Sequence, residues 1–365
     1  MINQPMPGEI DLIPTLRLYR EGQLLWIKRM PVILQLFCWV DYKKVVPSRT
    51  VIRLKIRDFV SNFYFMSFCI KEKVDLFIGV ESINAIAAIL LKRLGRVRTV
   101  LYFCNDYHPK RYTKLKNLLF LKLDEISSYF SDYIWMMNPS IHESRVIRGL
   151  KVSRLAPHFV IHGGLPFFPG GPVPLQKRKI NSIIYATRAG HLGLEIILKS
   201  FSKVLTKYAD SKLYITGHAD KNKLKLWPLM EKLKIINNVI FTGFIKEEEL
   251  NRLVQCSYIG IAIWSCESHS SATYGDPEKI RRYFHFGLPV VSTSNAFTAE
   301  TIKKHGAGIV VDDNVESVAQ AIIRLFEDKE LYSSSANASA NLGNFYRENN
   351  LLDDSIKDLE NKGMI

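Results

Sequence analysis

The chain has 365 residues, of which 47% are hydrophobic and 23% are charged. This balance excludes an intrinsically disordered protein and leaves room for two hydrophobic cores. A formal net charge of +15 favours an anionic partner such as a nucleotide or an acidic membrane surface. The five cysteines lack a Cys-x-x-Cys spacing, which predicts neither a zinc site nor a disulfide framework and suits the cytoplasm.

The first 70 residues fit a regular α/β pattern least well. Residues 24–45 and 49–71 have the pattern of long amphipathic helices, and no strand with a glycine-rich turn is recognisable before LIPTLRLYREG (12–22). The first strand–helix unit is therefore either absent or unrecognisable, and we expect it to be absent. The apolar runs 30–40 and 59–70 fall short of the roughly 18 residues that span a bilayer, and no leader pattern opens the chain.

From residue 75 the sequence alternates between short apolar runs and amphipathic segments. This alternation is typical of a parallel sheet covered by helices. The pattern predicts strands at 75–80, 97–103 and 132–137, and helices after Ser82 to Gly95, over 115–130 and over 140–149.

Residues 158–174 interrupt this alternation with four glycines and four prolines, a composition typical of an interdomain linker. Beyond it, six further short apolar runs predict a second doubly wound parallel sheet. These strands are expected at 182–187, 212–217, 239–243, 258–264, 289–294 and 308–311. We predict two Rossmann-like α/β domains facing a ligand cleft at the carboxyl ends of their strands. The expected divisions are 1–160, a linker at 161–178, a second domain at 179–345 and a C-terminal helix at 346–365.

The stretch YGDPEKIRRYFHFGLPVV (274–291) has the pattern of a short helix leading into a strand. Asp276 is a suitable N-cap, Pro277 suits the first helical position, and Gly287 can end the helix in a left-handed conformation. One interpretation is an ordinary surface helix. The other is a helix N-terminus that faces a phosphate, with Lys279 beside it.

Five segments in the second half, in this order, resemble the GT-B glycosyltransferases, in particular the retaining family 4 enzymes (glycosyl transferases group 1). They are YATRAGHLGLEIILKSF (185–201), LYITGHAD (213–220), VIFTGFIKEEEL (239–250), GDPEKIRRYFHFGLPVVST (275–293) and GAGIVV (306–311). In the first half, DLFIGVES and VLYFCNDYHPKRY are similar to the acceptor-binding half of that group. The resemblance covers roughly half of the chain, and several motifs in order are more specific than any one of them.

The resemblance implies a nucleotide-sugar donor, without a metal or other cofactor. Its departing diphosphate builds up negative charge, which cations and a helix dipole can stabilise. Arg188 matches the family arginine that contacts the diphosphate. The lysine that usually follows is missing, and Lys279 is the natural substitute. The donor-binding residues expected in this way are Arg188, Gly217, Tyr274, Gly275, Lys279 and Ile280.

The sequence departs from the family at its pair of glutamates, where it has Tyr274 and Arg282. An arginine cannot accept hydrogen bonds from ribose hydroxyls, so Asp276 or Glu278 is expected to contact the donor instead. The stereochemical outcome, retaining or inverting, stays open for this reason. A degenerate, non-catalytic member of the family is an alternative.

On the acceptor side, Asp106 and His108 directly follow a strand and could order the acceptor hydroxyl or take its proton. Glu81 is a second carboxylate at a strand end. Turn chemistry and helix capping explain the same residues without a catalytic role. We name Asp106, Asp276 and Glu278 as the candidate catalytic residues.

Two segments, 49–73 and 108–125, combine several cations with aromatic and aliphatic residues. Such helices suit contact with an anionic membrane surface, although a core face opposite a solvated face gives the same pattern. No nucleic-acid-binding motif is present. We predict a cytoplasmic hexosyltransferase, with the inner membrane face as its place of action, in cell-surface polysaccharide synthesis on a saccharide or lipid-linked acceptor. The alternatives are a sugar-nucleotide epimerase of the same fold and a nucleotide-sugar-binding subunit.

Overall fold

The protein forms two compact units, each described here by itself. Residues 1–162 together with 355–365 make the first unit, and residues 163–354 make the second. The computed structural model describes residues 15–20, 23–29, 56, 59–64, 66, 70–105, 107–161, 168, 170–187, 193–217, 220–265, 273–275, 277–348, 355, 357, 359–361 and 363.

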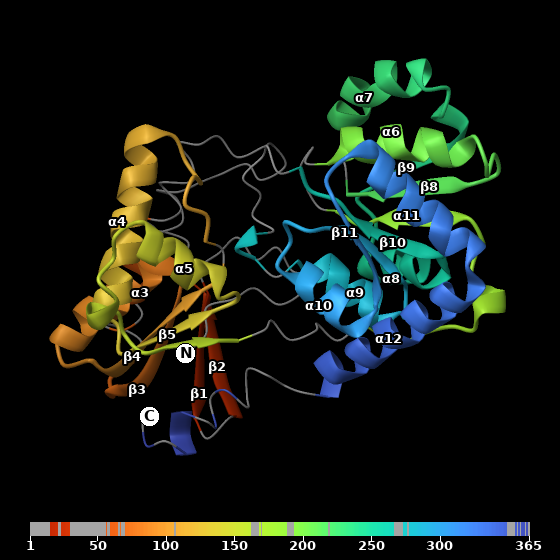
Figure 1. The fold of residues 1–365 in the computed structure, drawn as a ribbon. Helices are drawn as coiled ribbons and strands as arrows, with labels where there is room; N and C mark the ends of the chain where they lie inside the picture. Colours follow the sequence, from red (N-terminus) through yellow and green to blue (C-terminus); the bar gives the residue numbers. More distant parts are fainter. Residues whose placement is uncertain are drawn as a thin grey trace. The chain divides into compact units, whose positions relative to one another are not determined.

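The first unit is built on a parallel four-stranded sheet with the order β3-β4-β5-β6 (Figure 1). Helices α3 and α4 pack against each other beside it. The predicted alternation over 75–149 is confirmed. The strands are β3 (Val74–Val80), β4 (Val97–Cys104), β5 (Tyr133–Met136) and β6 (His158–Val160), and the helices are α3 (Glu81–Arg93), α4 (Lys114–Phe130) and α5 (Ser140–Ile147).

Strand β6 corrects one expectation, because its residues open the stretch 158–174 that was predicted to be a linker throughout. It pairs in parallel with β5, with Ile134 opposite His158. The sequence His-Phe-Val-Ile is apolar enough to extend a sheet, and the glycines that suggested a linker begin only at Gly163.

The N-terminal region contains an antiparallel hairpin of β1 (Thr15–Arg20) and β2 (Gln23–Arg29). The prediction of a helix beginning at residue 24 was therefore wrong for residues 24–29. Leu16 and Leu18 alternate with cations and Tyr19, and a two-residue connection containing Gly22 follows, which is a hairpin pattern. Residues 59–64 are helical, within the helix expected over 49–71. The other residues of the two expected helices lie outside the described part, apart from isolated positions.

The second unit contains a parallel six-stranded sheet with the order β12-β11-β10-β7-β8-β9. All six predicted strands are confirmed. They are β7 (Ser182–Tyr185), β8 (Lys212–Thr216), β9 (Val239–Gly243), β10 (Ile259–Ala262), β11 (Val290–Thr293) and β12 (Gly308–Val311). After β7 the chain adds β8 and β9 on one side of it. It then crosses back to place β10, β11 and β12 on the other side of β7. The topological switch point, where such sheets bind ligands, therefore lies between β7 and β10.

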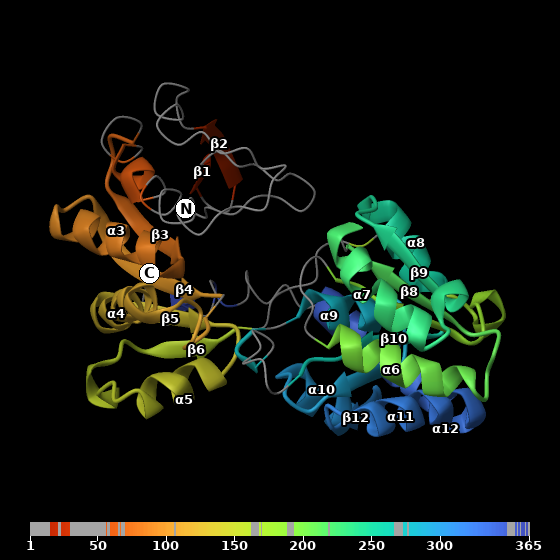
Figure 2. The same ribbon diagram turned by 90° about the horizontal axis from the view of Figure 1, so that it is seen from above.

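Helices cover both faces of this sheet, and a separate core lies on each face (Figure 2). Ile183 and Ile259 pack toward α6 and α11, whereas Ile184 and Val290 pack toward α8, α9, α10 and α12. This two-sided burial explains why the strands are continuously apolar. The helices are α6 (Leu194–Leu205), α7 (Asp220–Lys232), α8 (Glu247–Cys256), α9 (Glu278–His285), α10 (Thr298–His305), α11 (Val315–Glu327) and α12 (Lys329–Glu348).

Helix α9 is buried between the sheet and α12, and two glycines permit this position. A Cβ atom at Gly260 on β10 would lie 2.5 Å from the ring of Tyr283, and one at Gly343 on α12 would lie 2.5 Å from the carbonyl oxygen of Phe284. Ile280, Tyr283 and Phe284 are fully buried, so the predicted buried face of this helix is confirmed. The interpretation of α9 as an ordinary surface helix is wrong.

Membrane-spanning helices are not found among the residues that the structure describes.

Candidate functional site

The carboxyl ends of β7 and β10 form the centre of the candidate site. The hydroxyl of Tyr283 lies between the two strands, where it accepts a hydrogen bond from the amide of Ala186 at 2.8 Å and lies 3.3 Å from the carbonyl oxygens of Ile184 and Ile261. This buried hydroxyl ties α9 to both strands at the switch point. The first turn of α9 is therefore held at the edge of the sheet where a ligand would bind.

Two glycines shape the loops at this edge. Gly193, just before α6, has a φ of 84°, and a Cβ atom there would lie 2.2 Å from the carbonyl oxygen of Ile263. Gly217 follows β8 with a φ of 74° and donates its amide hydrogen to the carbonyl of Gly243 at 2.8 Å. At Gly193 the backbone lies too close to Ile263 for a Cβ atom, and at Gly217 the left-handed φ favours glycine.

Trp264 follows β10 and has a fixed backbone. Its amide donates to the hydroxyl of Thr293 at 3.0 Å, and its carbonyl accepts from the side chain of Asn295 at 3.1 Å. The indole is buried. It provides a rigid apolar wall beside the switch point.

Lys279 extends from the first turn of α9 toward this wall. Its Nζ lies 4.2 Å from the ring centroid of Tyr185, at the end of β7, and 5.2 Å from that of Trp264. Burial of the ammonium group lowers the pKa of Lys279 to about 7. Among the residues that the structure describes, no carboxylate forms an ion pair with it. Among the described residues the two ring faces favour its charge, and the position is suited to an anionic ligand.

Helix α9 begins one residue later than the sequence predicts. Pro277 is its N-cap and Glu278 its first helical residue, and Pro277 has no side chain that could cap the helix. Proline suits this boundary as well, because it has no amide hydrogen to leave unpaired. Asp276, the expected N-cap, lies outside the described residues, as do Arg188 and Asp106.

Arg282 occupies the position of the family's later glutamate, and its side chain is almost fully buried. Nη1 lies 2.5 Å from Glu247 and 2.6 Å from Asn251, both on α8, and Nη2 donates to Glu278 at 2.7 Å. The guanidinium carbon is 4.2 Å from the ring centroid of Phe168. Arg282 therefore joins α8, α9 and the segment before β7.

The other expected donor-binding residues lie in different environments. Ile280 has its side chain in the core, and its amide donates to the carbonyl of Pro277 at 3.0 Å. Tyr274 and Gly275 are partly exposed just before α9. Glu278 is partly exposed and oriented by Arg282. Trp264 and Tyr185, which flank Lys279, were not predicted. Trp264 ends the predicted strand 258–264 and Tyr185 lies near the end of the predicted strand 182–187, and this signal could have identified them.

In the first unit, the loop after β4 carries the acceptor-side candidates. Its residue Tyr107 is buried and contacts the hydroxyl of Ser144 at 3.1 Å. The side chain of Asn117 on α4 accepts from the amide of Tyr112 at 3.0 Å and donates to the carbonyl of Pro109 at 2.8 Å. His108 is also buried, and its Nδ1 accepts from the amide of Lys110 at 3.1 Å. The described part of this loop is firmly attached to α4 and α5.

A buried ion-pair network lies beneath this loop. Asp124 on α4 accepts from Arg145 at 2.6 Å and from the hydroxyl of Tyr102 at 2.9 Å, and it lies 3.2 Å from Arg148. Burial acts to raise the pKa of Asp124, but the two guanidinium groups outweigh it and hold the pKa below its usual value. Arg148 also donates to the hydroxyl of Tyr107 at 2.9 Å, so the network supports the loop.

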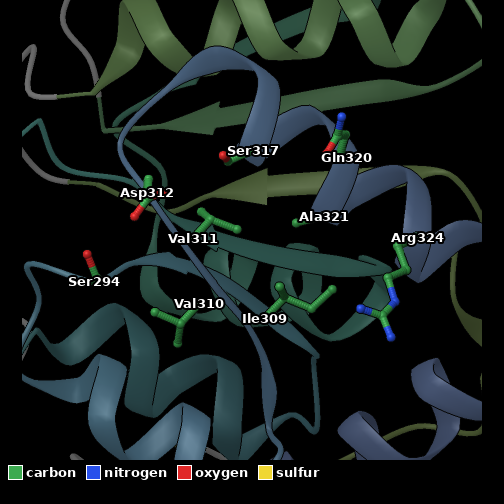
Figure 3. A pocket seen from close by; sticks show the side chains of 9 residues that line it. All are labelled: Ser294, Ile309, Val310, Val311, Asp312, Ser317, Gln320, Ala321 and Arg324. Atoms are coloured by element: carbon green, nitrogen blue, oxygen red, sulfur yellow. The ribbon is translucent and has the colours of Figure 1, made fainter.

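A groove of about 370 Å³ lies between α11 and β12, and Figure 3 shows the side chains that line it. Ser294 and Asp312 lie toward one end of it, and Arg324 lies at the other. The groove follows the edge strand, two positions from β10, and none of its lining residues is a predicted site residue. Clusters of three or more potential metal ligands were not found within the described ranges.

Comparison with known proteins identifies the second unit by sequence. Residues 181–328 match the family model Glycosyl transferases group 1. No curated protein matches the chain at a significant level.

Solved structures show the same fold at low sequence identity. Sucrose-phosphate synthase from Thermosynechococcus elongatus superposes with a TM-score of 0.63 at 12% identity, over 83% of this chain and 77% of that one. Anabaena Alr3699/HepE in complex with UDP and glucose gives 0.64 at 13%, over 88% and 84%. The pneumococcal O-GlcNAc transferase GtfA in complex with UDP and GlcNAc gives 0.64 at 12%, over 82% and 59%. The two parallel-sheet α/β units have the fold of the GT-B glycosyltransferases.

Proposed function

We propose that this chain, whose fold is GT-B and whose residues 181–328 match Glycosyl transferases group 1, is a glycosyltransferase that transfers a hexose from a UDP-sugar to a saccharide or lipid-linked acceptor. The neighbours from Anabaena and pneumococcus, described in complex with UDP, support the choice of base. We place the reaction at the inner face of the cytoplasmic membrane, in cell-surface polysaccharide synthesis, with segments 49–73 and 108–125 contacting the lipid. GDP-sugars are the alternative donors.

The observation that carries the proposal is the position of Lys279. Its ammonium group lies at the switch point between β7 and β10, without a carboxylate partner in the described part of the chain. A diphosphate bound there would restore the charge that burial disfavours. As the bond between the sugar and the diphosphate of the donor breaks, negative charge accumulates on the β-phosphate. Lys279 and Arg188 would then bind the transition state more strongly than the intact donor.

We propose the remaining roles from the family resemblance and from the positions of these residues in the sequence. Gly217 and the backbone of Tyr274, Gly275 and Ile280 would line the donor site. Asp276 and Glu278 would contact donor hydroxyls, Glu278 with the carboxylate that Arg282 orients. Asp106 in the first unit would order the acceptor hydroxyl or take its proton.

Thermal unfolding with UDP, GDP and ADP tests the donor site, because a ligand that binds only the folded state raises the unfolding midpoint. We expect UDP to stabilise the wild type, Arg188→Ala and Lys279→Ala to lose most of this shift, and Lys303→Ala, an exposed cation on α10, to keep it. An equal UDP shift in Lys279→Ala would contradict the proposed clamp.

Turnover then separates the three candidate activities. Release of UDP from a UDP-sugar only when an acceptor is present indicates transfer. Isomerisation of the sugar nucleotide without acceptor indicates an epimerase. Binding without either reaction indicates a nucleotide-sugar-binding subunit, which the arginine at position 282 favours as the second candidate.

A further inference from the structure

The first half of α4 exposes an apolar face. Leu115, Leu118 and Leu119 are 77%, 64% and 58% exposed, and their spacing of i, i+3 and i+4 places them side by side on one face of the helix. Single exposed leucines are common on protein surfaces, but adjacent ones on consecutive turns form a patch. We call these three residues the leucine face.

The unit does not need the leucine face for its own core, because other residues of α4 already attach the helix. The ring of Phe120 lies 6.3 Å from that of Tyr107 and 5.6 Å from that of Tyr112. Asn117 holds the preceding loop, and Asp124 is buried in the ion-pair network. The leucines therefore point away from everything that α4 packs against.

Cations surround the leucine face, and exposed carboxylates are nearly absent from the same stretch. Lys114 and Lys116 lie on the same two turns, and Lys122 on the next. Of the two acidic residues in 108–125, Asp124 is buried with Arg145, and Glu125 is paired with Lys122 at 3.0 Å. The charges on the first turn of this helix, from Lys114 and Lys116, are therefore positive.

We infer that the leucine face and its lysines form a docking surface for an anionic lipid bilayer. Leucines can enter the boundary between headgroups and acyl chains while lysines bind the anionic headgroups. Charge complementarity selects this partner, because a second copy docked through the same face would bring lysines against lysines.

Docking would also bring the acceptor loop to the membrane. Asn117, two residues from Leu115, holds Pro109 and Tyr112 of that loop. A lipid-linked acceptor would then lie close to the loop that carries Asp106. The docking surface rests on the lipid contact that the proposed function gives to segment 108–125, and this step rests on its lipid-linked acceptor as well. Vesicle binding tests the surface separately from the UDP shift, which tests the donor site.

Co-sedimentation of the full chain with vesicles tests the inference. We expect binding to vesicles of phosphatidylcholine mixed with phosphatidylglycerol, weaker binding at high salt, and little binding to phosphatidylcholine alone. The triple substitution Leu115→Ser, Leu118→Ser and Leu119→Ser should weaken binding at least tenfold, and Lys114→Gln with Lys116→Gln should weaken it on anionic vesicles. Ile147→Ser, which removes a leucine-sized side chain that is 86% exposed on α5, should bind as the wild type does.

The thermal shift with UDP, measured on every variant, shows whether the donor site is intact and the chain folded. Equal vesicle binding by the triple serine variant and the wild type would overturn the inference, as would no binding by the wild type to anionic vesicles. A wild-type dimer that the serine substitutions dissociate would overturn it in favour of self-association. Vesicle binding without a UDP shift would leave the docking surface supported and contradict the proposed donor instead.

Discussion

At the scale of single residues, Lys279 shows how the surroundings of a side chain determine its pKa. Burial lowers its pKa to about 7, and the rings of Tyr185 and Trp264 offset only part of the lost hydration. Because the folded pKa lies below the unfolded one, the unfolded state binds more protons from about pH 7 to 10. The contribution of this lysine to stability therefore rises with pH across that window and falls as the pH drops toward 7.

This pKa predicts that UDP binding depends on pH. Between pH 7.5 and 9 the lysine of the free protein is mostly neutral, so binding must take up a proton, and affinity should fall by up to about tenfold per pH unit. Lys279→Arg should flatten the profile, because arginine stays protonated. Isothermal titration calorimetry in buffers of different ionisation enthalpy measures both the affinity and the proton uptake. A flat wild-type profile would contradict the prediction.

Arg282 leads to a prediction about the family glutamate that it replaces. Arg282→Glu would place a third carboxylate beside Glu247 and Glu278, and we expect a loss of about 3 kcal/mol in the free energy of unfolding without a gain in turnover. Arg282→Met should cost less, because it removes the buried charge along with its partners. Urea unfolding and UDP release measure the two effects. Higher turnover in Arg282→Glu would mean that position 282 faces the donor.

Asp124 supports the acceptor loop by neutralising buried arginine. Asp124→Asn should lower the free energy of unfolding by about 3–5 kcal/mol, because Arg145 stays buried without a counter-charge. Its low pKa means that this stabilisation is complete above about pH 4 and is lost as the pH falls further. Lys92→Gln, which breaks the more exposed pair with Asp132, should cost less than about 1 kcal/mol. Equal losses of unfolding free energy for Asp124→Asn and Lys92→Gln, measured by urea unfolding, would contradict the stabilising role given to the buried ion pair.

At the scale of elements, the position of α9 determines the candidate site. The buried hydroxyl of Tyr283 ties α9 to β7 and β10, and Gly260 leaves space for its ring. Lys279 reaches the switch point only because the helix lies so close to the sheet. A shift of α9 would therefore change ligand binding as well as stability.

Gly260→Ala tests this packing. The added methyl group would overlap the ring of Tyr283, so we expect a loss of about 1–3 kcal/mol in stability and a weaker UDP shift, because α9 must move outward. Gly171→Ala is the matched control, since a Cβ atom there meets nothing within 4 Å. Thermal unfolding with and without UDP measures both effects. An unchanged UDP shift in Gly260→Ala would mean that donor binding does not depend on how α9 packs against the sheet.

At the scale of the whole molecule, the two units have separate sheets and separate cores. Every described residue of the proposed donor site belongs to residues 163–354. The proposed acceptor loop and the leucine face belong to the first unit. Donor binding and acceptor recognition are thus assigned to different units, as the GT-B fold permits.

This division predicts that the fragment 163–354 folds and binds UDP by itself, within a factor of about three of the full chain, because the core on each face of its sheet lies within the fragment. Its UDP affinity, measured by calorimetry beside that of the full chain, tests this. A folded fragment without UDP affinity would show that the donor site needs the first unit.

The sequence by itself determined the alternation of strands and helices from residue 75. The spacing of apolar residues along the chain is a local property, and it distinguishes continuous apolar strands from amphipathic helices. It also placed Lys279 at the start of α9 and Gly287 at its end. It did not determine the hairpin at residues 15–29, because short apolar runs fit a strand or a helix equally well until a partner strand is known.

Only the tertiary structure decided how these residues meet. Tyr185, Trp264 and Lys279 are about 80 and 15 residues apart along the chain, and only the crossover from β9 to β10 brings them to one edge of the sheet. The burial of Arg282 and the outward direction of the leucine face likewise depend on which neighbours fill the space around a helix. A local sequence pattern specifies the faces of an element, whereas long-range packing decides which face meets the core, a ligand or a partner.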